Sequence, residues 1–344
     1  METPSQILLI RLSSIGDILL TLPTIQELKR SYPDTAIDFV IAREYQDVLT
    51  PVRHLLRNII AYDKSKTGSE NRRIRRIIRE QQYPLIIDLQ NNLRTLQLTL
   101  LQKGSVRRFA KHHLRRFCFV KWRWNVFHYP PVWRRYLSII PLNPGGAVFR
   151  ITDPRHDPGV IARLKADIPA LAEQRRSILI YPGARHFTKR WLPEYYQKLI
   201  TLILGETDYA VILGGSRAEA ADNQRLAAIA PHQITDTSGK YTLSENFTLV
   251  SLCHLTISND SAPMHIAALL GKPQIAIFGS TVRQFGFYPE NPRAEIMEDN
   301  SVTCRPCSHI GHEKCPQQHF RCMRNITPEQ IYAKLRHLIE RSFK

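Results

Sequence analysis

Residues 6–17 read QILLIRLSSIGD, and this stretch decides the fold. The apolar run Gln6–Arg11 is typical of a strand buried on both faces of a parallel sheet. Two serines end the run, Gly16 permits a tight turn, and Asp17 stands where a helix begins. A buried strand that passes through a tight turn into a helix opens a βαβ unit, so the stretch predicts an α/β fold.

The alternation of strands and helices continues outward from this turn. Apolar spacing predicts helices over Ile18–Tyr32, Asn71–Gln82 and Arg94–Gln102, and strands over Ala36–Ala42, Ile59–Tyr62 and Pro84–Leu89. The segment Pro141–Asp157 is rich in Pro and Gly, which predicts a domain boundary. Buried strands resume at Ser177–Tyr181, Ala210–Leu213, Leu255–Ser258 and Gln274–Phe278. Two α/β domains with parallel sheets are therefore expected.

The length of 344 residues suits two such domains. The chain contains no run of about 18 uncharged apolar residues, which argues against a spanning helix. Its N-terminus does not resemble a signal peptide, because Arg11 ends the first short apolar run. We therefore expect a cytoplasmic protein.

The chain is strongly basic, with a net charge of +18 from 48 Lys and Arg against 30 Asp and Glu. Residues 101–150 contain eleven Lys or Arg and no acid, and a second basic cluster lies in residues 64–80. Such a field attracts polyanions, whether nucleic acid, anionic lipid or phosphorylated glycolipid. For any one residue, solvated surface charge is the alternative. None of the usual DNA- or RNA-binding motifs accompanies the charge, so we expect no nucleic-acid partner.

Two of the turns after strands carry anion-binding features, and ligands of open α/β sheets bind at such turns. Residues 181–191 (YPGARHFTKRW) place Lys189 and Arg190 before a helix start, which suits a diphosphate or is only a solvated basic loop. Residues 259–265 (NDSAPMH) combine a hydroxyl, a histidine and a helix start, which again suits an anion.

The acids in these turns have two readings each. Asp17 is either a general base at the edge of the sheet or only the cap of the following helix. Asp260 is likewise either a ligand contact or a cap. No turn has the spacing of a Walker A loop or of the GxGxxG fingerprint, and no Asp-x-Asp metal motif occurs.

Taken together, five motifs resemble the ADP-heptose:lipopolysaccharide heptosyltransferase family, glycosyltransferase family nine. They read RLSSIGDILLTLP, DLQNNLR, YPGARHFTKRWLPEYY, VILGGSRAE and ISNDSAPMHIAALLGKPQIAIFGSTV, in the family's order, over about residues 7–330. The resemblance implies the GT-B architecture, in which two Rossmann-like domains face a central cleft. It places an acceptor domain at 1–155 and a nucleotide-sugar domain at 156–326. The C-terminal helix, 327–344, is expected to pack back towards the first domain.

The resemblance also implies an inverting, metal-independent transfer of heptose from ADP-heptose to the lipopolysaccharide inner core. Asp17 matches the family's general base, with Ser14 and Gly16 beside it on the acceptor side. The matching donor contacts are Thr188, Lys189, Glu219, Asp260, Ser261, Ala262 and His265. The family's Asp-Thr-Gly-x-x-His turn reads Asp-Ser-Ala-Pro-Met-His here, a departure that affects side-chain contacts more than backbone ones.

The resemblance offers an explanation for the basic residues, since the family's acceptor is an anionic glycolipid of the inner membrane. Arg94, Arg115 and Arg116 are expected to suit it. The stretch KHHLRRFCFVKWRWNVF interleaves cations with Phe and Trp, as interfacial helices do. We expect a monomer that docks peripherally on the cytoplasmic surface of the inner membrane.

A cysteine-rich segment, residues 304–322, follows the last predicted strand. Its four cysteines have the spacing C-x2-C-x7-C-x6-C and are Cys304, Cys307, Cys315 and Cys322. The first pair has the spacing of a zinc knuckle, so one hypothesis is a structural zinc ion. The other is a group of reduced thiols that packs the loop. No cofactor is expected for catalysis.

Three alternatives to a heptosyltransferase follow from the same features. A related transferase could use another nucleotide sugar or acceptor, because the motifs alone do not select the sugar. A GT-B enzyme of another kind, such as a nucleotide-sugar epimerase, shares the architecture. A basic nucleic-acid-binding α/β protein fits the charge but not the motifs.

Overall fold

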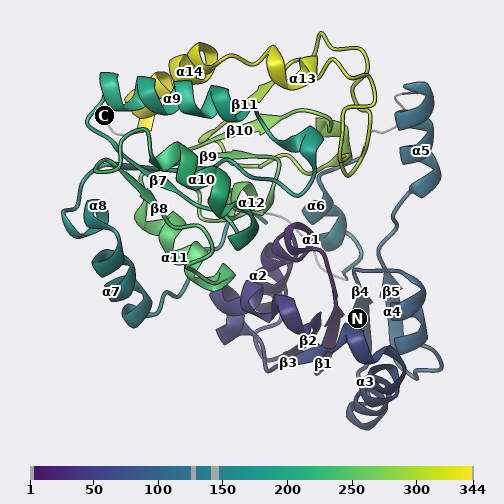
Figure 1. Cartoon of the computed structure of the whole chain (residues 1–344). Helices are drawn as coiled ribbons and strands as arrows, with labels where there is room; N and C mark the ends of the chain where they lie inside the picture. The colour runs from purple at the N-terminus through teal and green to yellow at the C-terminus, as the bar shows by residue number, and fades with distance from the viewer. Residues whose placement is uncertain (1–3, 125–128, 141–146, 343–344) are drawn as a thin grey trace. The chain divides into compact units, whose positions relative to one another are not determined.

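The computed structural model describes residues 4–124, 129–140 and 147–342, and the chain forms two compact units. Unit 1 comprises residues 1–113 and 130–155, and unit 2 comprises residues 114–129 and 156–344. Each unit contains one parallel β-sheet with its helices, labelled in Figure 1. Within the described residues no helix is long and apolar enough to cross a membrane.

The sheet of unit 1 has five parallel strands in the spatial order β3-β2-β1-β4-β5. The strands are β1 (Gln6–Ile10), β2 (Ala36–Ala42), β3 (Asn58–Tyr62), β4 (Leu85–Asp88) and β5 (Ser105–Arg108). The central strand β1 is fully buried from Ile7 to Ile10, as its apolar run predicts. The direction of chain travel reverses between β1 and β4, so the loops after these strands flank the switch point where α/β sheets bind ligands.

Unit 1 has short helices beside its sheet. They are α1 (Ile15–Leu19), α2 (Leu22–Ser31), α3 (Thr67–Gln81), α4 (Leu93–Leu98), α6 (Val132–Leu137) and the 3-10 helices η1 (Arg43–Leu55) and η2 (Lys64–Lys66). The single helix predicted over Ile18–Tyr32 is wrong, since the chain breaks between α1 and α2. Pro23 explains the break, because a residue without an N–H fits the first turn of a new helix better than a helix interior.

The sheet of unit 2 has six parallel strands in the order β11-β10-β9-β6-β7-β8. The strands are β6 (Ser177–Tyr181), β7 (Ala210–Leu213), β8 (Ile234–Asp236), β9 (Leu255–Asn259), β10 (Gln274–Phe278) and β11 (Ala294–Glu298). The switch point lies between β6 and β9. The loops after these two strands are the predicted donor turns, so the topology of the sheet brings both turns to one place.

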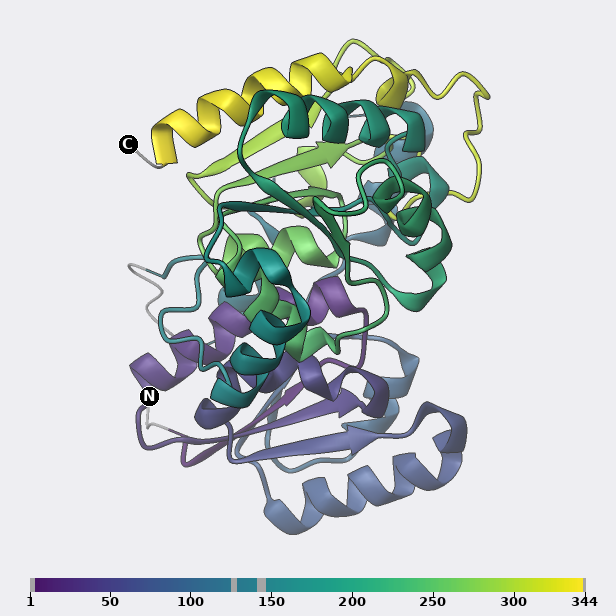
Figure 2. The same ribbon diagram turned by 60° about the vertical axis from the view of Figure 1, so that its left-hand side comes forward.

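The helices of unit 2 complete a second βαβ pattern. They are α5 (His113–Trp122), α7 (Pro158–Asp167), α8 (Pro169–Ala172), α9 (Pro193–Glu206), α10 (Ala220–Ala227), α11 (Leu243–Leu252), α12 (Ala262–Leu269), α13 (Arg321–Arg324), α14 (Pro328–Ser342), η3 (Phe187–Lys189), η4 (Arg217–Glu219) and η5 (Arg283–Phe285). Figure 2 shows α14 lying beside α9. Ile331, Leu335 and Leu338 recur at helical spacing on α14 and are buried in the core of unit 2.

Two expectations about the domains need correction. Helix α14 packs on α9, β10 and β11 of unit 2, whereas we expected it to pack back towards the first domain. The segment 114–129 belongs to unit 2, although it precedes the boundary expected at residue 155. Hydrophobic packing is the reason in both cases: on α5, Phe119 is buried against Phe285, with 5.7 Å between the ring centroids.

Candidate active site

Asp17 lies in the first turn of α1, directly after the switch point of unit 1. Arg11 Nη2 lies 2.8 Å from Asp17 Oδ2 in an ion pair. The Ser14 hydroxyl donates to the same oxygen at 2.9 Å, and the Ser14 backbone N–H donates to it at 3.3 Å. The side chain keeps 24% exposure, and Oδ1 accepts no hydrogen bond from the described residues. Asp17 is therefore held by one oxygen and presents the other.

The charge of Asp17 is set by opposing effects. Burial alone would raise the pKa of its carboxyl, but the Arg11 guanidinium and the hydrogen bonds from Ser14 outweigh burial and lower that pKa. Asp17 is consequently a carboxylate at neutral pH, ready to accept a proton. The sequence did not single out Arg11 as a site residue, although the motif contains this arginine six residues before Asp17.

The loop that carries Asp17 is fixed by the turn after β4. Gln90 Oε1 accepts hydrogen bonds from the backbone N–H groups of Leu12 and Ser13, each at 3.1 Å. Asp88 in turn shapes its own loop, accepting from the N–H groups of Gln90 and Asn91 at 3.0 and 2.7 Å. This loop is the DLQNNLR motif, and its contribution is to position the β1 loop. Sequence reasoning missed Gln90 because nothing local links it to residues 77 and 78 positions earlier.

The predicted acceptor residues do not all belong to one unit. Ser14, Gly16 and Arg94 lie in unit 1, where the Arg94 guanidinium stands 5.6 Å from the centroid of the Tyr62 ring. Arg115 and Arg116 lie on α5 and belong to unit 2. The Arg115 side chain donates to the Tyr129 hydroxyl at 2.6 Å, also within unit 2.

The predicted donor residues do gather in unit 2. Lys189 Nζ lies 2.7 Å from Asp260 Oδ2, which joins the loop after β6 to the loop after β9. The Thr281 hydroxyl donates to the same Asp260 oxygen at 2.6 Å, adding the loop after β10. Burial alone would raise the pKa of Asp260, but the Lys189 ammonium outweighs it and lowers that pKa. Asp260 thus serves chiefly to hold a cation at the carboxyl end of the sheet.

Helix α12 starts beside this ion pair. Ser261 is its N-cap residue and Ala262 its first residue. The unpaired N–H groups and the dipole of a helix start favour an anion. His265 is buried one turn into the helix, and its proximity contributes to lowering the pKa of Asp260. A phosphate group suits this combination of an ammonium group and backbone donors.

Thr188 is hydrogen-bonded to the backbone of the cysteine-rich segment, a contact that the sequence did not predict. Its hydroxyl accepts from the His312 backbone N–H at 2.8 Å, and its own N–H donates to the His312 carbonyl at 3.1 Å. The side chain is almost fully buried. Thr188 therefore fastens the cysteine-rich segment to the donor loop, and its hydroxyl also donates weakly to the His312 carbonyl at 3.4 Å.

The Glu219 side chain lies close to Gly183 in the loop after β6. Its Oε2 accepts from the Ser216 N–H at 2.6 Å and from the Ser216 hydroxyl at 2.8 Å. A Cβ atom at Gly183 would lie only 1.7 Å from Glu219 Oε1, so any side chain there would displace the Glu219 carboxylate. The Asn259 amide also donates to the Pro182 carbonyl at 2.7 Å, which closes the same loop against β9.

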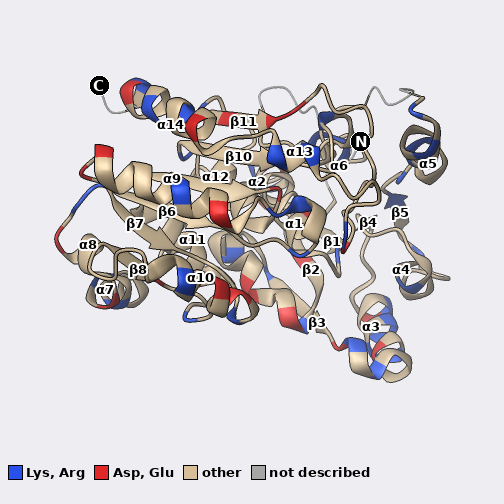
Figure 3. Cartoon of the chain, turned by 45° about the horizontal axis from the view of Figure 1, so that its top comes forward, with Lys and Arg blue, Asp and Glu red and all other residues tan. Residues whose placement is uncertain are grey.

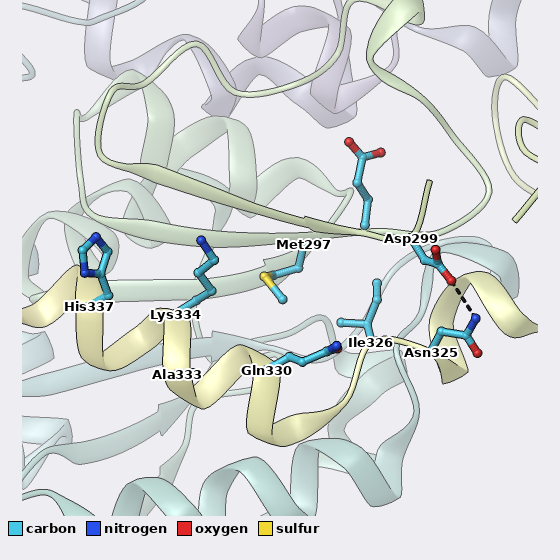
Figure 4. A pocket seen from close by; sticks show the side chains of 9 residues that line it. Met297, Asp299, Asn325, Ile326, Gln330, Ala333, Lys334 and His337 are labelled. Carbon is cyan, nitrogen blue, oxygen red and sulfur yellow. Dashed lines mark hydrogen bonds between the residues drawn. The ribbon is translucent and has the colours of Figure 1, made fainter. Parts of the chain in front are cut away.

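A pocket of about 750 Å³ lies between β11 and α14, shown in Figure 4. Its lining residues are Met297, Glu298, Asp299, Asn325, Ile326, Gln330, Ala333, Lys334 and His337. None of the residues predicted from the sequence lines it. Glu298 is already engaged by the Tyr288 hydroxyl and by Arg305. We therefore place the site at the switch-point loops and not in this pocket.

The cysteine-rich segment does not form a metal site as it is folded. Cys304 Sγ lies 3.8 Å from His319 Nε2, but the described residues contain no group of three or more Cys, His, Asp or Glu side chains that could hold a metal ion. Burial raises the pKa of Cys307 to about 11 and that of Cys322 to about 12. Four cysteines are a donor set that zinc accepts, but the described side chains are not gathered into a tetrahedral group.

Comparison with known proteins gives one consistent answer. The model of glycosyltransferase family 9 (heptosyltransferase) matches residues 71–318. Lipooligosaccharide heptosyltransferase 2 of Haemophilus influenzae is 27% identical over 353 residues, which cover 97% of this chain and 99% of that protein. Lipopolysaccharide heptosyltransferase 3 of Escherichia coli is 26% identical over 279 residues, or 77% and 81% of the two chains.

Solved structures agree on the fold. The Escherichia coli ADP-heptose lps heptosyltransferase II has a TM-score of 0.73 at 19% identity, covering 98% of this chain and 99% of that one. The heptosyltransferase WaaC of Escherichia coli, solved with ADP-2-deoxy-2-fluoro heptose, has a TM-score of 0.66 at 16% identity, covering 96% and 99%. These likenesses confirm the expected GT-B class, and the family match confirms a glycosyltransferase. The chain belongs to glycosyltransferase family 9, the heptosyltransferase family.

Proposed function

We propose that this enzyme transfers heptose from ADP-heptose to the inner core of lipopolysaccharide, with Kdo-lipid A or heptosyl-Kdo-lipid A as the acceptor. The names of the relatives support the sugar and the acceptor. One structural observation carries the proposal: each switch point bears one half of the required chemistry. A carboxylate with a free oxygen stands in unit 1, and an ammonium group beside a helix start stands in unit 2.

The reaction follows from these two groups. An acceptor hydroxyl oxygen attacks the anomeric carbon of the heptose, and Asp17 Oδ1 takes the hydroxyl proton. The bond between the anomeric carbon and the phosphate oxygen breaks, and ADP leaves with the bonding electrons. Attack from the face opposite ADP inverts the anomeric centre. Arg11 and Ser14 keep Asp17 oriented and ionised throughout.

The leaving diphosphate needs compensation for its charge. Lys189 supplies an ammonium group, and the N–H groups at Ser261 and Ala262 supply backbone donors. We propose that Asp260 and His265 support that end of the site and that Glu219 contacts the ribose. With these groups we propose that catalysis requires no metal ion.

A donor screen tests this proposal. Purified enzyme is offered ADP-heptose, ADP-glucose and UDP-glucose, each with and without Kdo-lipid A, and nucleotide release is measured. We expect rapid release of ADP from ADP-heptose only when acceptor is present. Preference for another nucleotide sugar would overturn the substrate assignment, and acceptor-independent release would indicate an epimerase or hydrolase.

We further propose that the enzyme works as a monomer on the cytoplasmic surface of the inner membrane and that α5 contributes to docking. Leu114, Phe117 and Trp122 are exposed on this helix, and Trp124 is exposed just after it. Cations alternate with these apolar side chains at Arg115, Arg116, Lys121 and Arg123. Apolar side chains among cations suit the interface of an anionic bilayer.

Liposome flotation tests the contribution of α5. Reversing the charges of Arg115, Arg116, Lys121 and Arg123 should weaken binding to anionic vesicles, because each cation near such a surface adds about 1 kcal/mol. Unchanged flotation of this variant would exclude docking through α5. Sedimentation of the same preparations without lipid checks the proposed monomer.

A further inference from the structure

Helices α3 and α4 lie on the same face of the sheet in unit 1. The crossovers from β3 to β4 and from β4 to β5 run in the same direction across the sheet, so right-handed connections place both helices on one face. The helices are also bonded to each other. Asn71 Nδ2 donates to Gln97 Oε1 at 3.0 Å, and Arg75 Nε donates to the Gln97 carbonyl at 2.9 Å.

The outer side of α4 is apolar. Its buried side is formed by Thr95 and Leu98, which leaves the opposite side to face outward. That side carries Leu93 and Leu96, and the chain continues with Leu100 and Leu101. These four residues, the leucine ridge, are 45% to 91% exposed. Four neighbouring exposed leucines are unusual for a surface that meets only water.

The outer side of α3 is cationic. Ile74 and Ile78 pack inward, while Arg72, Arg76 and Arg79 recur at helical spacing on the opposite side and are exposed. We call these three residues the arginine ridge. Figure 3 shows Lys and Arg positions along α3 and α4. Residues 71–103 contain seven Lys and Arg against two acids, of which Asp88 is fully buried.

We propose that the leucine ridge and the arginine ridge together form a docking surface for an anionic lipid bilayer. A bilayer interface offers lipid phosphates to the guanidinium groups and an apolar layer to the leucines. Nucleic acid would satisfy the arginines but leave the leucines in water. A second copy of this chain would bring arginines against arginines if it used the same surface. Of these three partners, only a lipid bilayer provides both anions for the arginine ridge and an apolar layer for the leucine ridge.

This inference rests on the proposed function in one respect, since a lipid-borne acceptor requires the enzyme to reach a membrane. It adds a surface in unit 1 that shares no residue with α5, which belongs to unit 2. Arginines would attract the protein, and inserted leucines would make the attachment resistant to salt.

Flotation of the full-length protein tests the two ridges separately. The vesicles contain phosphatidylethanolamine and phosphatidylglycerol, or phosphatidylcholine alone as the neutral reference. Arg72→Glu with Arg76→Glu should lower partitioning onto anionic vesicles at least about twentyfold, since each surface cation contributes about fivefold. The matched control, Lys165→Glu with Arg336→Glu, reverses two exposed cations in unit 2 and should stay within about twofold of wild type.

The leucine ridge is tested by salt. The triple variant Leu93→Ser, Leu96→Ser and Leu100→Ser should float at low salt and be released at high salt, where wild type remains bound. Wild-type flotation of both the arginine and the leucine variants would overturn the proposal. So would a leucine variant that loses only concentration-dependent self-association, because that result would assign the ridge to contacts between copies.

The same variants separate this inference from the proposed function. With detergent-dispersed acceptor, both ridge variants should release ADP within about twofold of wild type, since neither ridge holds a group of the reaction. Absence of transfer by wild type would overturn the proposed function while leaving the flotation results to decide the docking surface. Circular dichroism confirms that each variant is folded.

Discussion

Arg11 and Asp17 form an ion pair that sets how enzyme activity depends on pH. Asp17 acts as a base only when ionised, so activity falls as pH drops through its folded pKa, which lies below the ordinary value. Replacing Arg11 with Met removes the guanidinium and leaves burial to raise that pKa. We predict that the acid limb of kcat/KM moves to higher pH in Arg11→Met. Superimposable acid limbs of the two enzymes would show that Arg11 does not tune the base.

Lys189 carries the second residue-scale prediction. Its ammonium group is held by Asp260 and is the cation placed beside the start of α12. We predict that Lys189→Ala weakens ADP binding by about tenfold to a hundredfold, the magnitude of one charge-assisted hydrogen bond. Titration calorimetry with ADP measures it, and Lys165→Ala, an exposed lysine, serves as the control. Equal affinities in wild type and Lys189→Ala would remove Lys189 from the donor site.

At the scale of single residues, the sequence predicted which loops carry the candidate residues but not the contacts that these residues make. Asp17, Lys189 and Asp260 were predictable because each lies in a turn after a buried strand. The bond between Thr188 and His312 was not, because it joins residues 124 positions apart through an irregular segment. Gln90 was hidden for the same reason. Periodicity reports on local structure and carries no information about such distant contacts.

Helix α5 depends on one buried side chain. Phe119 packs against Phe285, while Leu114 on the same helix is 81% exposed. We predict that Phe119→Ala raises the rate of amide hydrogen exchange over residues 114–122, since the helix loses its anchor in unit 2. Leu114→Ala should leave that rate unchanged. Equal exchange in Phe119→Ala and wild type would mean that other contacts hold α5.

The cysteine-rich segment gives a prediction about metal removal. Burial raises the pKa of the Cys307 and Cys322 thiols, and no metal-binding group forms among the described residues. We predict that enzyme treated with a chelator releases ADP within about twofold of untreated enzyme and that protein purified without chelator holds under about 0.2 zinc per chain. Stoichiometric zinc would instead support the structural site suggested by the cysteine spacing.

At the scale of elements, the buried central strands and the edge strand β3 were predictable, whereas the other three edge strands were not. The predictions for β1, β2, β3, β4, β6, β7, β9 and β10 are confirmed to within one or two residues. We had no prediction for β5, β8 and β11, whose sequences are SVRR, ITD and AEIME. Each lies at the edge of its sheet and is only partly buried. A strand with one neighbour needs no continuous apolar run, so it lacks the signal that identifies a central strand.

At the scale of the whole molecule, two α/β units were predictable from the repeated alternation of strands and helices. The assignment of residues 114–129 to unit 2 was not, because chain order alone placed them in the first domain. The same holds for α14, whose apolar stripe predicts burial but not which surface it packs on. Membership of a unit is decided by complementary packing of side chains, which a single sequence does not display.

The central claim is that Asp17 is the base of an acceptor-dependent heptosyl transfer. The most direct measurement is acceptor-dependent release of ADP from ADP-heptose by wild type, Asp17→Ala and Asp222→Ala, an exposed aspartate on α10 that serves as the control. We predict that Asp17→Ala loses about 10²- to 10⁴-fold in kcat while its affinity for ADP, measured by calorimetry, stays near that of wild type. Asp222→Ala should match wild type. Turnover by Asp17→Ala within about tenfold of wild type would contradict the account.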